Sequence, residues 1–127
     1  MEDMREYFES TTGIGVLATA DSAGKVDSAI YGRPHVTGEG EVAFIMTDRL
    51  SHRNVTENPH ACYLFKEDGK GYRGKRLYLT RLRETQDRAK IEELRRRKRE
   101  NESDEDRFLV YFSVTDIRPL VGDSPGE

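Results

Sequence analysis

The chain has 127 residues, of which 35% are hydrophobic and 35% are charged, and its formal net charge is −3. A chain of this length forms one domain with one core, and its acidic balance argues against a general attraction to nucleic acid. The single cysteine, Cys62, excludes an intramolecular disulfide, and without a signal-peptide run or a long apolar stretch we expect a cytoplasmic protein with no membrane partner.

The first segment predicts a short helix followed by a β-hairpin. Apolar residues recur at helical spacing among charged ones, and the helix is expected to end before Gly13. Two extended segments follow, residues 15–20 and 26–33, and residues 21–24 between them have the composition of a tight turn. We therefore expect two paired antiparallel strands after the helix.

A third strand, a short helix and a fourth strand are expected next. Pro34 interrupts the second strand, and residues 42–47 are apolar enough to be buried on both faces. Ser51 is the expected N-cap of a helix that ends at Pro59, because the residue before a proline avoids the α region. Residues 60–65 then predict the fourth strand.

A fifth strand and a charged segment begin the second half of the chain. Residues 77–80 alternate in polarity, while Leu82 falls out of the alternation and indicates a bulge or the end of the strand. Residues 81–107 carry nearly balanced charges and few large apolar groups. They predict a solvated helix that contacts the body mainly through Ile91 and Leu94.

The last strand has the clearest alternation, over residues 108–117. One face carries Phe108, Val110, Phe112 and Val114, and the other carries Leu109, Tyr111 and Ser113. The sequence as a whole predicts a single domain over residues 1–127, with six strands and a charged accessory helix at about residues 86–104.

The most informative segment is the turn over residues 47–53. A buried strand ends at Thr47, and the next residues supply a hydroxyl, two guanidinium groups and an imidazole as a helix begins. Free backbone N–H groups and the positive end of the helix dipole suit a phosphate. Arg33, near the end of the second strand, would add a bidentate clamp if it arrived beside the turn. The alternative is that Ser51 only caps the helix and the arginines are solvated.

The order of these features has a counterpart in a known family. Residues 15–19 read GVLAT, a glycine-containing turn follows, the next strand has Arg33 near its end, and the third strand closes in Thr47. A basic, serine-containing turn then leads to the ENP sequence at residues 57–59. Over roughly residues 13–78 the chain resembles the pyridoxamine 5'-phosphate oxidase-like, FMN-binding split-barrel family.

The resemblance implies a fold, a cofactor and a partner. The fold is mainly β with accessory helices, a six-stranded antiparallel split β-barrel, and flavin mononucleotide (FMN) lies in a groove between the subunits of a homodimer. The resemblance places three residues along the isoalloxazine edge, Ala29, Ile30 and Tyr31. It places six residues at the phosphate, Arg33, Thr47, Arg49, Ser51, His52 and Arg53.

Two departures limit what the resemblance implies. The interval from Ser51 to Asn58 is shorter than in typical members, which leaves the identity of the phosphate ligands open. No Arg-x-His element follows Phe108, so oxidation of pyridoxine or pyridoxamine phosphate is not expected. The three histidines lack the spacing of a zinc site, and glutamates bracket the basic run at residues 95–99, so we expect neither a metal nor a nucleic-acid partner.

Three functional hypotheses remain at this stage. The first is a flavin-dependent oxidoreductase that acts on a small-molecule redox substrate, with no acid, base or nucleophile identified in the sequence. The second is a flavin-binding or sensing module without turnover. The third replaces FMN with the deazaflavin F420 that some relatives of the same barrel use.

Overall fold

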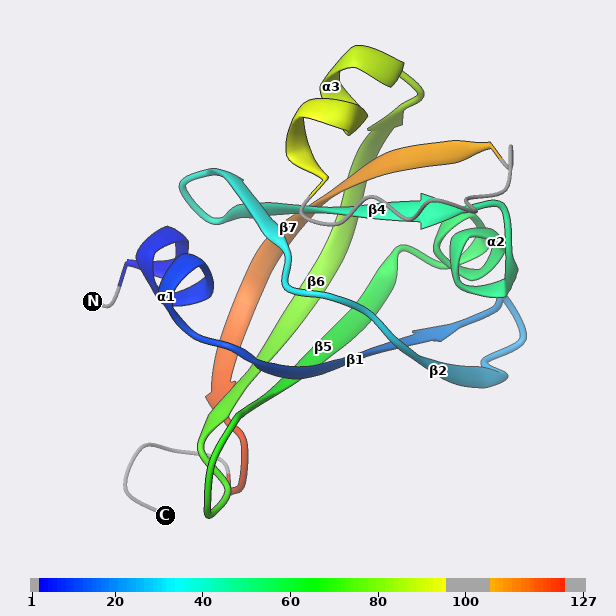
Figure 1. Ribbon diagram of the computed structural model, residues 1–127. Coiled ribbons are helices and arrows are strands. Elements are labelled where there is room, and N and C mark those ends of the chain that lie inside the picture. Colours follow the sequence, from blue (N-terminus) through cyan, green and yellow to red (C-terminus); the bar gives the residue numbers. More distant parts are fainter. Residues whose placement is uncertain (1–2, 96–105, 123–127) are drawn as a thin grey trace.

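The computed structural model describes residues 3–95 and 106–122, and a seven-stranded antiparallel sheet forms the body of this part of the chain (Figure 1). The strands are β1 (Gly13–Ala20), β2 (Val26–Ile30), β3 (His35–Gly38), β4 (Glu41–Thr47), β5 (His60–Glu67), β6 (Gly74–Thr85) and β7 (Arg107–Pro119). They follow the order β2-β1-β5-β6-β7-β4-β3 across the sheet. The sheet curls around one core, and its two edge strands, β2 and β3, do not pair with each other, which leaves the barrel split.

Three helices of the described ranges cover the sheet: α1 (Met4–Ser10), α2 (Leu50–Glu57) and α3 (Arg88–Leu94). The first two lie on opposite sides of the molecule (Figure 1). Tyr7 and Phe8 are the buried residues of α1, and the Tyr7 hydroxyl donates to Glu67 of β5 at 2.7 Å. None of these helices is both long and apolar enough to cross a membrane.

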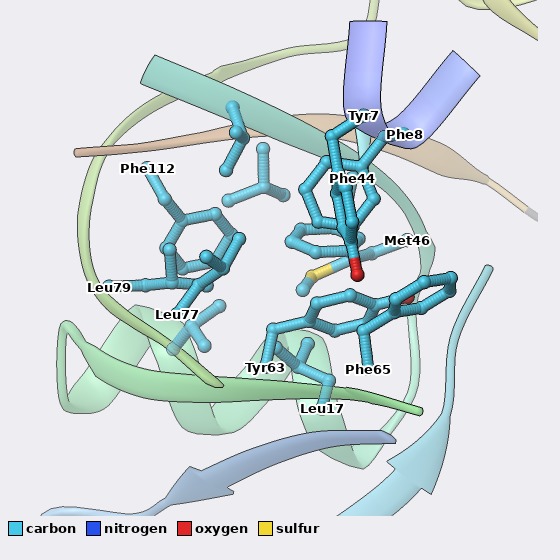
Figure 2. Close-up of a cluster of buried hydrophobic side chains, with 13 residues drawn as sticks. Tyr7, Phe8, Leu17, Phe44, Met46, Tyr63, Phe65, Leu77, Leu79 and Phe112 are labelled. Carbon is cyan, nitrogen blue, oxygen red and sulfur yellow. The ribbon is translucent and has the colours of Figure 1, made fainter. Parts of the chain in front are cut away.

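The main core lies inside the curl and is rich in aromatic rings (Figure 2). Each of α1, β4, β5 and β7 contributes rings to it, and β6 adds Leu77 and Leu79. Phe44 lies near the centre, with its ring centroid 5.0 Å from that of Tyr63 and 6.0 Å from that of Phe112. Such edge-on and tilted contacts add to the stability that burial alone provides.

The strands β4 and β7 both contribute residues to two clusters, one on each face of the sheet, and for β4 the sequence predicts this two-sided burial. Phe44 faces the main core, whereas Ala43 and Leu109 belong to a second cluster on the other side of the sheet. This second cluster is covered by α3, whose Ile91 is only 3% exposed, and Leu94 packs against it. The predicted role of Ile91 and Leu94 as anchors is confirmed.

The segment after residue 80 departs from the prediction. Residues 81–85 continue β6 instead of starting a helix, because pairing with β7 satisfies their backbone groups while their charged side chains remain accessible. The bulge indicated at Leu82 is confirmed by a shift in register between Arg81 and Arg83. Of the predicted accessory helix, α3 is the described part, and residues 96–105 lie outside the described residues.

A seventh strand, β3, joins the six that the sequence predicts. The second strand ends at Ile30, earlier than predicted, and the residues after Pro34 pair with β4. His35 lies opposite Ala43 in this pairing, and Val36 lies opposite Val42. The chain therefore crosses between the two edges of the split barrel within a few residues.

Candidate functional site

The turn between β4 and α2 is the first part of the site. Thr47 is the last residue of β4 and pairs with Arg107 of β7. The backbone N–H of Arg49 donates to the carbonyl oxygen of Thr47 at 2.8 Å, and this tight turn leads directly into α2. Arg49 and Arg53 are both exposed. Two guanidinium groups therefore lie in the first turn of a helix that begins directly after β4.

The expected role of Ser51 as N-cap is wrong. The helix α2 starts at Leu50, and the N-cap residue is Arg49, whose side chain makes no capping hydrogen bond. In contrast, Asp3 and Asp87 cap α1 and α3 with their carboxylates. The first N–H groups of a helix have no intrahelical partner, and the helix dipole adds partial positive charge there. The start of α2 thus has donors and a field that suit an anion.

Tyr31 connects this turn to the end of β2. Its hydroxyl hydrogen-bonds with the buried Ser51, and the charges of Asp27 and Arg49 act on it. Burial raises the pKa of Tyr31, and the bond to Ser51 and the charge of Arg49 offset this only in part. The hydroxyl is therefore neutral near pH 7. The Tyr31 ring packs edge-on against Phe44, with the centroids 5.9 Å apart.

A cavity of about 760 Å³ lies beside Tyr31, where the chain crosses between the two edges of the barrel. This volume falls within the usual range for small-molecule sites, roughly 300 to 1,000 Å³. The apolar part of its lining includes Ile14, Ile30, Phe44 and Ile45. Polar lining comes from Tyr31, Arg33, His35 and Asp68, with the backbone of Gly13, Gly15 and Gly32. The lining therefore offers both apolar contacts and hydrogen-bonding groups to a small molecule.

Tyr63 supports the wall of the cavity from inside the barrel. Its hydroxyl donates to the carbonyl oxygens of Tyr31 and Gly32 at 3.2 and 3.0 Å. The neighbouring residue Gly15 makes room for this arrangement, since a Cβ there would lie 1.9 Å from the Tyr63 hydroxyl oxygen. The N–H of Tyr31 also donates to the carbonyl oxygen of Gly15 at 3.0 Å. The backbone beside the cavity is thereby held in place.

Arg33 lies in the cavity wall, but its Nη1 points to α1 and not to the turn between β4 and α2. Its Nη1 donates to the carbonyl oxygens of Phe8 and Thr11, at 2.7 and 3.2 Å. Both carbonyls belong to the C-terminal end of α1. The expected clamp beside Thr47 is therefore replaced by an anchor that holds α1 against the barrel.

His52 is buried on the other side of α2. Its Nε2 lies 2.9 Å from Oε1 of Glu84, and its ring stacks on Phe108 with the centroids 4.0 Å apart. Its Nδ1 has no hydrogen-bond partner among the described residues and lies 3.8 Å from Oδ1 of Asp48. No cluster of three metal-ligating side chains occurs within residues 3–95 and 106–122.

The three residues expected along the isoalloxazine edge do not share one face of β2. Ala29 lies opposite Leu17, whose side chain is fully buried in the core. Ile30 lies opposite Val16 on the outer face, is 67% exposed and lines the cavity. Tyr31 lies between the cavity and the turn. The structure thus brings Tyr31, Arg49 and Ser51 together, next to Ile30.

Sequence reasoning missed four residues that shape this region. Gly15 and Tyr63 support the cavity, Glu84 holds His52, and Arg107 pairs with Thr47. Gly15 was visible as part of the GVLAT segment, but only its packing against Tyr63 explains it. The other three come from strands far along the chain, and no local spacing signals their arrival.

The comparisons with known proteins address the fold. A scan against protein-family models finds no match. A search of curated proteins also finds no match. Among solved structures, an FMN-binding protein from Syntrophomonas wolfei matches with a TM-score of 0.75 and 16% identity, covering 94% of this chain and 84% of that chain.

Two further solved structures agree with this match. An F420 reductase has a TM-score of 0.70 and 15% identity, covering 92% of this chain and 98% of its own. A candidate pyridoxamine 5'-phosphate oxidase from Lactobacillus delbrueckii has a TM-score of 0.66 and 15% identity, covering 92% of this chain and 91% of its own. The chain therefore has the split-barrel fold of the FMN-binding and pyridoxamine 5'-phosphate oxidase-like proteins.

Proposed function

We propose that this chain is an FMN-binding flavoprotein that transfers electrons to or from a small molecule. The observation that carries the proposal is the position of Tyr31, which lines a cavity of about 760 Å³ and whose hydroxyl also interacts with Ser51 at the start of α2. The start of that helix has N–H groups and a dipole that suit an anion. A ligand with a phosphate at one end and a flat ring at the other fits that arrangement, and the fold is shared with an FMN-binding protein.

The residues of the turn fit a phosphate. The free N–H groups at the start of α2 and the hydroxyls of Thr47 and Ser51 can donate to its oxygens, and Arg49 and Arg53 supply positive charge. Charge-assisted hydrogen bonds of this kind are the strong ones. His52, which the resemblance also placed at the phosphate, turns its Nε2 toward Glu84. We therefore assign His52 a supporting position.

The cavity would receive the isoalloxazine ring, with Ile30 and Tyr31 against it. FMN supplies the exchange of hydride or electrons when bound, and the protein orients the ring and shields it from water. No described side chain is assigned as a general acid or base. Since no Arg-x-His element follows Phe108, we do not extend the proposal to oxidation of pyridoxine or pyridoxamine phosphate.

We also propose that the chain functions as a homodimer. On the outer face of the sheet, Val16 lies opposite Ile30 of β2 and Leu64 of β5. Ile14 and Val26 extend this face and are 52% and 79% exposed. Contiguous apolar surface of this kind marks an interface, and obligate interfaces commonly exceed about 2,000 Å² in total. Because Ile14 and Ile30 also line the cavity, a second copy on this face would help to close it.

A second candidate cofactor is favoured by one observation, the match to an F420 reductase over 98% of that chain. A deazaflavin also carries a phosphate and a flat ring, so the same turn and cavity would hold it. A flavin-binding module without turnover would use the same residues.

The visible absorption spectrum of the purified protein tests the proposal, because a flavin, a deazaflavin and an empty site give different spectra. A colourless protein that binds neither FMN nor F420 in titration would refute it.

A further inference from the structure

Glu84, near the end of β6, is the centre of a small, partly buried cluster next to the turn between β4 and α2. Its Oε1 accepts from Nη2 of Arg81 at 2.8 Å and lies 2.9 Å from Nε2 of His52, while its Oε2 lies 3.1 Å from the same nitrogen. The side chain of Glu84 is 22% exposed and that of His52 only 10%. Arg81 offsets the charge of the carboxylate, so the cluster adds little negative field to the neighbouring anion site.

The cluster holds the imidazole of His52 in one orientation. The ring lies nearly parallel to that of Phe108, at 12° and 4.0 Å between centroids, so it cannot tilt freely. A carboxylate only accepts hydrogen bonds, so Nε2 of His52 is the donor in this contact. The other nitrogen, Nδ1, is buried and lies toward Asp48 of the turn at 3.8 Å. The contact with Glu84 thereby fixes both the plane of the ring and the direction of Nδ1.

His52 belongs to the first turn of α2, so whatever holds its ring also holds the start of the helix. The neighbouring Ser51 interacts with the hydroxyl of Tyr31, the residue that follows the edge strand β2. Phe108 pairs with Met46, the residue before Thr47. The turn is thus braced from β2 through Ser51 and from β6 and β7 through His52. Positioning of this kind is what a preorganised anion site needs.

We propose that Glu84 is a positioning residue for the phosphate-binding turn, acting through His52 on the N–H groups of α2 and on Arg49. This inference rests on the proposed function, since it concerns how the same site achieves its preference for a phosphate. Glu84 itself does not contact the ligand. Its removal should therefore reduce affinity for the phosphate end of FMN and leave the ring end nearly unchanged.

The test compares affinities of the full-length protein for FMN and for riboflavin, which lacks the phosphate, by quenching of flavin fluorescence. The dissociation constant for riboflavin divided by that for FMN measures the contribution of the phosphate to binding. Glu84→Ala should lower this ratio about tenfold, the change expected for losing one charge-assisted contact. Glu84→Gln keeps an oxygen that accepts from Nε2 and should retain most of the ratio.

Glu41→Ala is the matched control for Glu84→Ala. The Glu41 side chain is also 22% exposed and also pairs with an arginine, Arg83 at 3.0 Å, but it lies at the start of β4, away from the turn. Its ratio should equal that of the wild type. Urea unfolding of each variant identifies any loss of the fold. If Glu84→Ala does not fold, Glu84→Met, which fills a similar volume without an oxygen that accepts from Nε2, carries the comparison and should lower the ratio in the same way.

The outcomes separate this inference from the proposed function. A wild-type protein that binds FMN and riboflavin equally, or binds neither, overturns the proposed function and this inference with it. A wild-type preference for FMN that survives Glu84→Ala overturns the inference alone. Parallel losses for both ligands in a folded Glu84 variant also overturn it, because they show a general structural effect.

Discussion

Two arginines that the sequence places in one phosphate pocket should respond differently to mutation. Arg49 stands at the start of α2, where its guanidinium is exposed beside the uncapped helix. A charge-assisted hydrogen bond contributes about 1.5 to 3 kcal/mol, so Arg49→Ala should weaken FMN about tenfold to a hundredfold. Its effect on riboflavin should be slight, because riboflavin carries no phosphate.

Arg33 should behave as a structural residue. Its Nη1 donates to two backbone carbonyls at the end of α1, and α1 carries Phe8, which is fully buried in the core. Losing two partly buried charge-assisted bonds should cost at least about 2 kcal/mol of unfolding free energy. Arg33→Ala should therefore shift the urea midpoint downward and weaken FMN and riboflavin by the same factor.

The assay is a pair of titrations for each variant, with FMN and with riboflavin, together with urea unfolding of the unliganded protein. The reasoning is refuted if Arg33→Ala loses FMN while riboflavin and stability are unchanged, since Arg33 would then contact the phosphate. It is equally refuted if Arg49→Ala weakens both flavins in parallel.

Three further predictions concern stability and assembly. Gly15→Ala should cost at least about 1 to 3 kcal/mol in urea unfolding because its Cβ would collide with the Tyr63 hydroxyl, while Gly32→Ala, which meets nothing within 4 Å, should be neutral. Ile14→Asp should convert a dimer to a monomer in light scattering, whereas Leu82→Asp, at a similarly exposed apolar residue (48% against 52%), should not; a wild-type monomer would contradict the proposed interface. Burial by itself would raise the pKa of Glu84, but the hydrogen bonds and charge interactions with Arg81 and His52 together outweigh it and lower that pKa. The contribution of Glu84 to stability is therefore present above the ordinary glutamate pKa and is lost as pH falls through the lower folded value. The stability difference between the wild type and Glu84→Gln should shrink in that acid range. A difference that grows there would contradict a lowered pKa for Glu84.

Much of the fold follows from local patterns. The alternation in residues 108–117 predicted a strand with Val110 on one face and Leu109 on the other, and these two residues belong to two different clusters. The apolar run at residues 42–47 needs the same two-sided burial, and pairing of β4 with β7 provides it. These signals can be followed locally because side chains alternate between the two faces of a strand with a period of two residues, so two apolar faces call for cover on both sides.

The charged segment after residue 80 shows where local patterns mislead. Residues 81–85 have the composition of a solvated helix, but pairing with β7 draws them into β6. β-propensity depends on the neighbouring strand more than on the residue itself. The same cause explains β3, whose four residues have a weak local signal and become a strand by pairing with β4.

For the site, the turn after Thr47, the basic residues on it and the helix that follows could be predicted from the sequence, because these lie within a few residues of one another. The use of their side chains depends on the tertiary structure. It turned Arg33 to the carbonyls of α1, Ser51 to Tyr31 and His52 to Glu84. Each of these partners comes from another element of the fold. Which donor meets which acceptor therefore depended on the packing of the strands and helices, which no local spacing encodes.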